Sequence, residues 1–236
     1  QLPERVSERV LAALAEMGVE AVELVVDEGH NSAAELLAHQ DEVKAVLARH
    51  RLTVASVASV LFWRYNLGST DEAVRRHAIE IVKGMLGVAK AYGAGVILIV
   101  AGQQEPHTPY IQTWNNAIRS IREAARTAEE LDVLIGVENV PTSFLYTPGE
   151  MARFLADVDH PNVGCYLDPG NGVWVRNGFP ENWCTALCGR IVAVHVKDFD
   201  PKLNKNVCCG QGQLPWAEVL PVLRECGYDG YLIVET

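Results

Sequence analysis

Short apolar runs alternate with longer segments of helical periodicity along the whole chain. The runs cover residues 21–26, 53–59, 96–101, 133–139, 163–168, 191–197 and 231–235, and they are largely apolar throughout rather than alternating with polar residues. Such runs are typical of strands that are buried on both faces, as in a parallel sheet. The pattern therefore predicts seven parallel strands, each next to a helix.

The segment from Ser69 to Gly93 illustrates the helix signals. Ser69 and Glu72 have capping-box spacing, and Gly93 stands where a left-handed residue ends many helices. Thr108 and Pro109 are expected to open the next helix, with proline at its first position. A further helical pattern covers about residues 4–17, before the first strand.

This order of elements predicts the α/β class and an eight-fold βα barrel, a TIM barrel, in a single domain over residues 1–236. Because the pattern begins with a helix and ends with a strand, the first strand and the last helix of such a barrel are expected to be absent from this chain. The alternative is an open doubly wound sheet. That fold is disfavoured because no glycine-rich phosphate turn of the GxGxxG or GxxxxGK[ST] type follows any of the runs.

Composition narrows the classes of function. The 236 residues include 30 acidic and 20 basic side chains, a formal net charge of −10 that disfavours binding to nucleic acids and to anionic membrane surfaces. The longest apolar runs, such as residues 95–101, are far shorter than the roughly 18 residues of a membrane span. A cytoplasmic protein is therefore expected.

The six cysteines all lie in the C-terminal third and include no CxxC pair. They are Cys165, Cys184, Cys188, Cys208, Cys209 and Cys226. A chain of this length needs no disulfides to stabilise its core, so reduced thiols are expected.

Metal-ligand residue types end four consecutive apolar runs. Glu138, Asp168, His195 and Glu235 follow one another at intervals of 30, 27 and 40 residues, each about one βα unit. In a barrel these side chains converge at the carboxyl ends of the strands, where catalytic sites lie. Charged residues also end strands simply because strands emerge into solvent there, but carboxylates crowded at one rim repel each other unless a cation compensates. The quartet therefore predicts a divalent metal site; Mn²⁺ is favoured, and Mg²⁺, Co²⁺ and Zn²⁺ also suit these ligands.

From Gly18 to Glu235 the sequence resembles the xylose-isomerase-like superfamily of sugar and sugar-phosphate isomerases and epimerases, and within it the L-ribulose-5-phosphate (L-xylulose-5-phosphate) 3-epimerase group. The stretches that carry the resemblance are residues 22–28, 67–75, 137–138, 168–171, 195–198 and 233–235.

The resemblance implies an isomerase in which Glu138 and Glu235 form the acid/base pair while also binding the metal with Asp168 and His195. Removing a proton next to a ketose carbonyl creates an enediolate, and a fixed cation stabilises that charge where it develops. One glutamate would remove the proton and the other would return one from the opposite face, which inverts that carbon. Return to the neighbouring carbon would give aldose–ketose isomerisation instead.

Three further residues are expected to contact the substrate, a sugar or sugar phosphate. The resemblance implies this for Asn171, as the Asp-x-Gly-Asn form is found in the pentulose-phosphate group. Lys197 lies two residues after His195, so it points to the same side of the strand and is expected to bind an oxyanion or to pair with a rim carboxylate. Glu23 lies inside the first apolar run, where a carboxylate is costly unless it is paired or functional.

One loop departs from the pentulose-phosphate group. That group tends to have Phe-Gly-Glu-Gly, whereas this chain has Cys209-Gly210-Gln211-Gly212. The glycines still allow close approach of a ligand to the backbone, but the charge is lost. Phosphorylated and free sugars therefore both remain candidate substrates.

Other functions of the same superfamily stay open. A dehydratase or isomerase of keto-inositols would use the same four ligands. A DNA-repair endonuclease is disfavoured by the net charge and by the small number of additional ligands, and a non-catalytic barrel is disfavoured by the intact quartet. Relatives of this kind are often dimers or tetramers, so a homo-oligomer is one option.

Overall fold

The computed structural model describes residues 8–235, in which seven parallel strands form one curved sheet. The strands are β1 (Ala21–Val26), β2 (Thr53–Ser59), β3 (Val96–Ile99), β4 (Leu134–Glu138), β5 (Val163–Leu167), β6 (Ile191–Val196) and β9 (Leu232–Val234). They are neighbours in this order, with β1 and β9 at the two edges. The prediction of seven parallel strands in an α/β barrel is confirmed; a closed eight-stranded barrel would have one more strand between β1 and β9.

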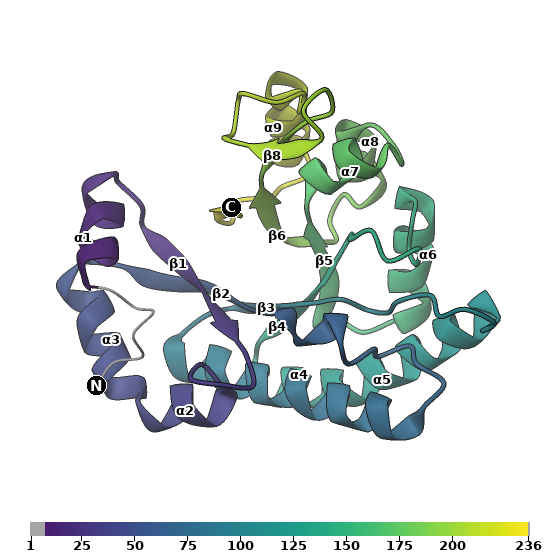
Figure 1. Cartoon of the computed structure of the whole chain (residues 1–236), viewed down its shortest axis with the longest axis horizontal. Coiled ribbons are helices and arrows are strands. Elements are labelled where there is room, and N and C mark those ends of the chain that lie inside the picture. The colour runs from purple at the N-terminus through teal and green to yellow at the C-terminus, as the bar shows by residue number, and fades with distance from the viewer. Residues whose placement is uncertain (1–7, 236) are drawn as a thin grey trace.

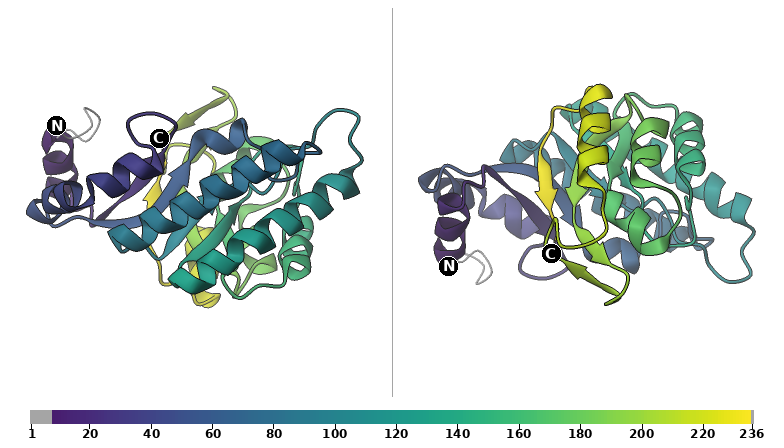
Figure 2. Two further views of the ribbon diagram at one scale, coloured as in Figure 1. Left: turned by 90° about the horizontal axis from the view of Figure 1, so that it is seen from below. Right: turned by 90° about the horizontal axis from the view of Figure 1, so that it is seen from above.

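Helices surround the strands (Figures 1 and 2). They are α1 (Glu8–Glu16), α2 (Ala33–Ala38), α3 (Gln40–Arg49), the 3₁₀ helix η1 (Val60–Trp63), α4 (Glu72–Tyr92), α5 (Tyr110–Leu131), α6 (Pro148–Val158), α7 (Pro169–Val175), α8 (Pro180–Ala186) and α9 (Trp216–Glu225). Figure 2 shows the long helices α4 and α5 side by side on the outside of the sheet. Helices cover the outer face of the strands and the barrel interior covers the inner face, which explains why the runs of the central strands are apolar on both faces.

Two predicted helix starts are corrected by the structure. Asp71, not Ser69, caps α4, because its Oδ1 accepts a hydrogen bond from the N–H of Ala73 at 2.8 Å. Pro109 precedes α5 instead of being its first residue. The end of α4 at Gly93, with φ of 77°, is confirmed. The predicted first helix begins at Glu8 in the described part of the chain, and residues 4–7 lie outside it.

The period-two geometry of the strands divides the core into two parts. Ile97 and Ile99 of β3 face outward and belong to the large core between the sheet and the helices. Val96 and Leu98 face the barrel interior, where they pack with Tyr166. Towards the carboxyl ends of the strands the inward positions become polar, so the interior changes from an apolar layer to a polar site.

A short antiparallel hairpin, β7 (Asp198–Asp200) and β8 (Lys205–Val207), was not predicted. The buried carboxylate of Asp198 accepts hydrogen bonds from the backbone N–H groups of Phe199, Gly210 and Gly212 at 2.9–3.0 Å. These contacts hold the loop after the hairpin against the end of β6. The loop is therefore organised by one side chain and not by local periodicity.

The prediction of six reduced cysteines is wrong for two of them. Cys188 and Cys226 form a disulfide between the ends of α8 and α9, with their Cα atoms 4.9 Å apart. The two helices pack against each other, which brings together residues 38 positions apart in the sequence. Cys165 and Cys184 are buried free thiols, and Cys208 and Cys209 are exposed free thiols.

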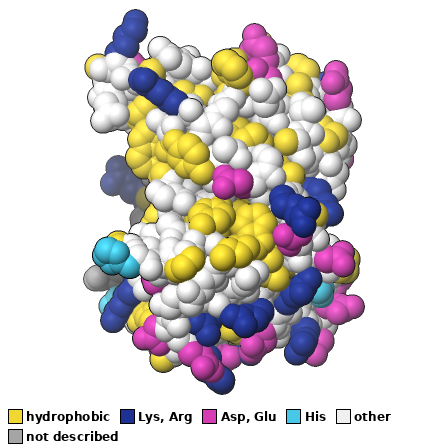
Figure 3. Space-filling model, turned by 90° about the vertical axis from the view of Figure 1, so that its right-hand side faces the viewer, with side chains coloured by type: hydrophobic (Ala, Val, Ile, Leu, Met, Phe, Trp, Pro, Cys, Tyr) yellow, Lys and Arg dark blue, Asp and Glu magenta, His cyan; other side chains and the backbone are white. Residues whose placement is uncertain are grey.

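No helix within residues 8–235 is both long enough and apolar enough to cross a membrane. Figure 3 shows the side of the molecule that lies to the right in Figure 1, where acidic and basic side chains are interspersed. This face therefore offers no continuous basic surface to a phosphate backbone.

Candidate functional site

The four predicted metal ligands lie at the carboxyl end of the barrel. Glu138 is the last residue of β4, and His195 is the penultimate residue of β6. Asp168 directly follows β5, and Glu235 directly follows β9. Each strand therefore delivers one potential ligand to the same end of the sheet.

These four side chains converge. One ligand atom from each lies within 4.8 Å of those from the other three. Asp168 is fully buried, Glu138 and His195 are nearly so, and the side chain of Glu235 is 44% exposed. A set of three carboxylates and one imidazole, buried on one side and open on the other, fits a divalent cation that keeps positions free for a substrate.

His195 lies between two glutamates from opposite sides of the barrel. Its Nδ1 is 3.2 Å from Oε1 of Glu138 and 3.7 Å from Oε2 of Glu235. Its Nε2 is 3.1 Å from Oε1 of Glu23 on β1. Nδ1 therefore faces the candidate ligands Glu138 and Glu235, whereas Nε2 faces Glu23.

Lys197 bridges two of the candidate ligands. Its Nζ is 2.7 Å from Oδ2 of Asp168 and 2.6 Å from Oε2 of Glu235. The alternation along β6 places His195 and Lys197 on the same side, as expected. The salt bridge to a rim carboxylate, one of the two predicted contacts for Lys197, is thus present.

The site contains more acidic side chains than basic ones. Burial raises the pKa of Glu138 and that of Asp168 above their ordinary values, and for Asp168 the ammonium of Lys197 only partly offsets this effect. Burial opposes protonation of His195, but its hydrogen bonds to Glu138 and Glu23 outweigh that effect and raise its pKa to about 10. The neighbouring carboxylates add to the effect of burial: Asp168 and Glu235 raise the pKa of Glu138 further, and Glu235 raises that of Asp168. A bound cation would relieve this clustering of negative charge.

Glu23 shows the opposite shift. Burial alone would raise its pKa, but the imidazole of His195 and the hydroxyl groups of Ser56 and Tyr166 lower it below the ordinary value. Glu23 is therefore held as a carboxylate in the barrel interior.

Asn139 fixes the backbone of Asp168 and was not predicted. Its Nδ2 donates to the carbonyl of Asp168 at 2.8 Å, and its Oδ1 accepts from the N–H of Asp168 at 2.7 Å. The side chain thus continues the hydrogen-bonding pattern of the sheet one step beyond β4 and β5. Its position directly after Glu138 was the available signal in the sequence.

Asn171 lies in the first turn of α7, which Asp168 caps by accepting a hydrogen bond from the N–H of Asn171 at 3.1 Å. The side chain of Asn171 is 98% buried, and no other described residue forms a hydrogen bond with its amide oxygen or nitrogen. A buried amide without partners is costly, so these two atoms have unused hydrogen-bonding capacity.

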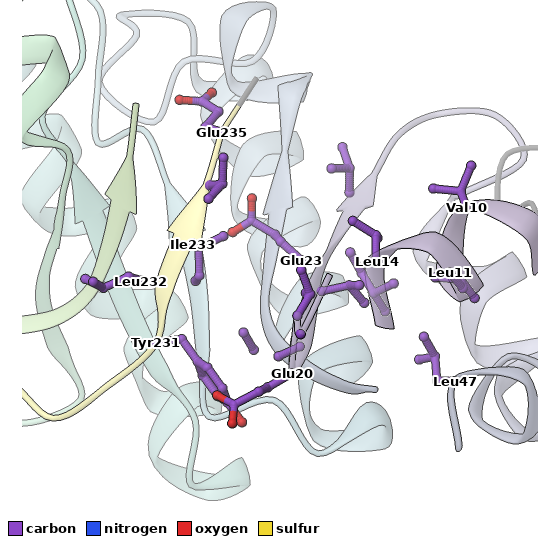
Figure 4. A pocket seen from close by; sticks show the side chains of 18 of the residues that line it. Val10, Leu11, Leu14, Glu20, Glu23, Leu47, Tyr231, Leu232, Ile233 and Glu235 are labelled. Atoms are coloured by element: carbon purple, nitrogen blue, oxygen red, sulfur yellow. The ribbon is translucent and has the colours of Figure 1, made fainter. Parts of the chain in front are cut away.

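A pocket of about 750 Å³ lies between β1, β9 and α1, and of the four candidate ligands Glu235 lines it (Figure 4). Glu23 and Glu235 come from facing strands and line this pocket. The rest of the lining is mainly apolar and includes Leu11, Leu14 and Leu47.

Comparison with known proteins agrees with this geometry. The family model of the Xylose isomerase-like TIM barrel matches residues 11–236. L-ribulose-5-phosphate 3-epimerase UlaE of Escherichia coli is 27% identical over 228 residues, which cover 93% of this chain and 78% of that protein.

Solved structures share the fold. A structure of D-psicose 3-epimerase with D-tagatose from Clostridium cellulolyticum superimposes with a TM-score of 0.81 and 20% identity, over 98% of this chain and 80% of that one. A structure of L-ribulose 3-epimerase gives a TM-score of 0.83 with 18% identity, over 100% of this chain and 77% of that one.

Proposed function

The chain belongs to the Xylose isomerase-like TIM barrel family, and on that premise we propose that it is a divalent-metal-dependent epimerase of a ketose sugar or sugar phosphate. It is an isomerase-class enzyme, as its named relatives are. The observation that supports the metal-dependent reaction is the convergence of Glu138, Asp168, His195 and Glu235 within 4.8 Å. Carboxylates suit Mg²⁺ and Mn²⁺ and imidazole suits transition metals, so Mn²⁺ is the proposed cation.

Glu138 and Glu235 are the proposed acid/base pair. They come from β4 and from the end of β9, with β5 and β6 between them, so a substrate held at Asp168 and His195 lies between the two carboxylates. One carboxylate accepts the proton from the carbon next to the carbonyl, and the other donates a proton from the opposite face. The cation, when bound, supplies positive charge that stabilises the oxygen on which negative charge develops.

Two residues are proposed to orient the sugar. The amide of Asn171 has free hydrogen-bonding capacity and is suited to a sugar hydroxyl. The ammonium of Lys197 lies between Asp168 and Glu235, where it can donate to a substrate oxygen beside the reacting carbon. Neither contact depends on a phosphate group, so free and phosphorylated ketoses both fit this proposal.

The test is proton exchange at the reacting carbon. Metal-stripped protein is supplied with Mn²⁺, and loss of the C3–H signal in D₂O is followed by NMR over pentuloses, hexuloses and their phosphates. Exchange is expected for at least one ketose, only with metal, and Glu138→Gln and Glu235→Gln should each reduce it by a factor of about 10² to 10⁴. Glu130→Gln, at an exposed position on α5, is the matched control and should have no effect.

Absence of exchange on every ketose would reject the epimerase proposal. Keto-inositols are then the next substrates to test, because dehydration or isomerisation of those compounds uses the same removal of a proton beside a carbonyl. Exchange that persists without metal would reject the metal dependence.

A further inference from the structure

We propose that Glu23 is a positioning residue that fixes the orientation of the His195 imidazole for metal binding. The inference rests on the proposed metal site. Both carboxylate oxygens of Glu23 lie close to Nε2 of His195, at 3.1 and 3.3 Å. The other ring nitrogen, Nδ1, faces Glu138 and Glu235. Glu23 is thus on the far side of the ring from Glu138 and Glu235.

The hydrogen bonds around Glu23 show which group is the donor and which the acceptor in its contact with the imidazole. The hydroxyl of Ser56 donates to Oε2 of Glu23 at 2.6 Å, and the hydroxyl of Tyr166 donates to the same oxygen at 2.7 Å. A carboxylate that receives two hydroxyl donors acts as an acceptor, so the remaining partner, Nε2 of His195, is the N–H donor. With a proton held on Nε2, Nδ1 is the nitrogen that gives up its proton and offers a lone pair when a metal ion binds.

The position of Glu23 is rigid. Ser56 and Tyr166 are fully buried; Ser56 holds Glu23 from the adjacent strand β2, and Tyr166 holds it from β5 across the barrel interior. The ring of Tyr166 also packs edge-on against the ring of His195, with centroids 4.6 Å apart. Hydrogen bonding and ring packing therefore restrict the same imidazole.

In a carboxylate–histidine–metal arrangement, a carboxylate forms a hydrogen bond to the ligating histidine without binding the metal itself. This role explains why Glu23 lies beside the site but is not one of the four ligands. Glu23 is absent from the group of four ligand atoms that lie within 4.8 Å of one another. A partner of this kind fixes the tautomer and the ring orientation of the ligating histidine, and its loss typically weakens metal binding by about 10- to 100-fold. Its side chain is 15% exposed, which leaves little of it for a substrate.

The experiment measures Mn²⁺ affinity of the metal-stripped chain by calorimetry, without any substrate. Glu23→Gln keeps a hydrogen-bond acceptor beside Nε2 and is expected to weaken Mn²⁺ binding about 10-fold, whereas Glu23→Ala removes the acceptor and is expected to weaken it by up to about 100-fold. Glu20→Gln is the matched control, because Glu20 is exposed and lies just before β1. Its affinity should equal that of the wild type.

A spectroscopic measurement reports the tautomer directly. In the Zn²⁺-loaded protein, a slowly exchanging Nε2–H signal of His195 is expected in ¹⁵N-edited NMR, and it is assigned by its loss in His195→Gln. The signal should exchange rapidly in Glu23→Ala. Tyr166→Phe keeps the packed ring and removes one donor to Glu23, so it should weaken Mn²⁺ binding less than Glu23→Ala does. It also tests the same contact if the Glu23 variants fail to fold.

Equal affinities of the wild type and both Glu23 variants would overturn the inference while leaving the proposed function intact. Equal losses in Glu23→Gln and Glu23→Ala would overturn it as well, because they would indicate an effect of charge alone. A wild-type protein that binds no Mn²⁺ would reject the proposed function, and this inference with it.

Discussion

Asn139 and Asp168 show how a single side chain positions a candidate ligand. The amide of Asn139 satisfies both backbone polar groups of Asp168 beyond the end of β5. These groups are buried, and a buried polar group without a partner costs about 1–3 kcal/mol. The rigidity of Asp168 therefore depends on its neighbour across the sheet as well as on its own strand.

Asn139→Ala should lower the free energy of unfolding by about 1–3 kcal/mol and should also weaken Mn²⁺ binding. Urea denaturation and calorimetry measure the two effects. Asn162→Ala is the control: its Nδ2 donates to the carbonyl of Val133 at 3.3 Å, away from the four ligands. That variant should leave Mn²⁺ affinity unchanged, and an equal loss of affinity in both variants would contradict the role of Asn139.

Gly170 allows Lys197 to reach the site. A Cβ atom at position 170 would lie 2.7 Å from both Cγ and the carbonyl oxygen of Lys197. Lys197 is the single residue between β6 and β7, so its backbone has little room to move and a larger side chain at position 170 would displace Lys197 from Asp168.

Gly170→Ala is therefore expected to cost about 1–3 kcal/mol of stability and to reduce epimerase activity more than Mn²⁺ affinity. Gly149→Ala in α6 is the control, because nothing lies within 4 Å of a Cβ atom there. Its stability should change by no more than about 1 kcal/mol, in the favourable direction. Full activity of Gly170→Ala would refute the proposed contact of Lys197 with the substrate.

At the scale of elements, the sequence predicted the strands well and the connections poorly. All seven strands were found because burial on both faces requires continuous apolar runs, such as Val163–Leu167 of β5. The hairpin of β7 and β8 was missed because Asp198 organises it through contacts with residues more than ten positions away. The Cys188–Cys226 disulfide was missed for the same reason: it depends on the packing of α8 against α9.

In the candidate site, too, the residues with a local sequence signal were predicted and the contacts between distant residues were not. The four ligands were predicted because each ends an apolar run, which is a local signal. The contact of Glu23 with His195 joins residues 172 positions apart, so only the closure of the sheet reveals it. Burial of Glu23 was foreseeable from the first run, but its partners were not.

The contact between α2 and α4 gives a prediction of pH dependence. The hydroxyl of Tyr92 in α4 donates to the carbonyl of Leu36 in α2 at 2.7 Å, and burial raises the pKa of Tyr92 to about 12. The folded state therefore keeps this proton above pH 10, where an unfolded tyrosine loses it. Its contribution to stability is complete below pH 10 and is lost as the pH rises towards 12.

Tyr92→Phe should cost about 1 kcal/mol at neutral pH, through the lost hydrogen bond. It should also show a shallower loss of stability between pH 10 and pH 12 than the wild type. Urea denaturation at a series of pH values measures both effects. Tyr146→Phe, at an exposed position, is the control for the slope. Parallel slopes for the wild type and Tyr92→Phe would contradict the prediction.

At the scale of the whole molecule, the candidate metal joins parts of the sheet that are weakly connected. β9 is an edge strand and within residues 8–235 pairs only with β6, through three residue pairs, whereas β1 and β2 share six. Glu235 follows β9, and its N–H donates to the carbonyl of Val196 at 3.2 Å. A cation held by Glu138, Asp168, His195 and Glu235 would link β9 to β4, β5 and β6 at once.

Saturation with Mn²⁺ should therefore stabilise the protein globally and slow hydrogen exchange locally in β9. At 100 times the dissociation constant, the expected gain is about 2.7 kcal/mol, measured by thermal or urea unfolding. Local unfolding of an edge strand costs less free energy than unfolding of the core. The largest decrease in hydrogen exchange on Mn²⁺ binding, measured by mass spectrometry, is therefore expected in the peptide that contains Leu232–Val234. Asp168→Asn should abolish both effects. A rise in global stability without added protection of β9 would show that the cation binds without Glu235, and the acid/base pair would then have to be sought elsewhere.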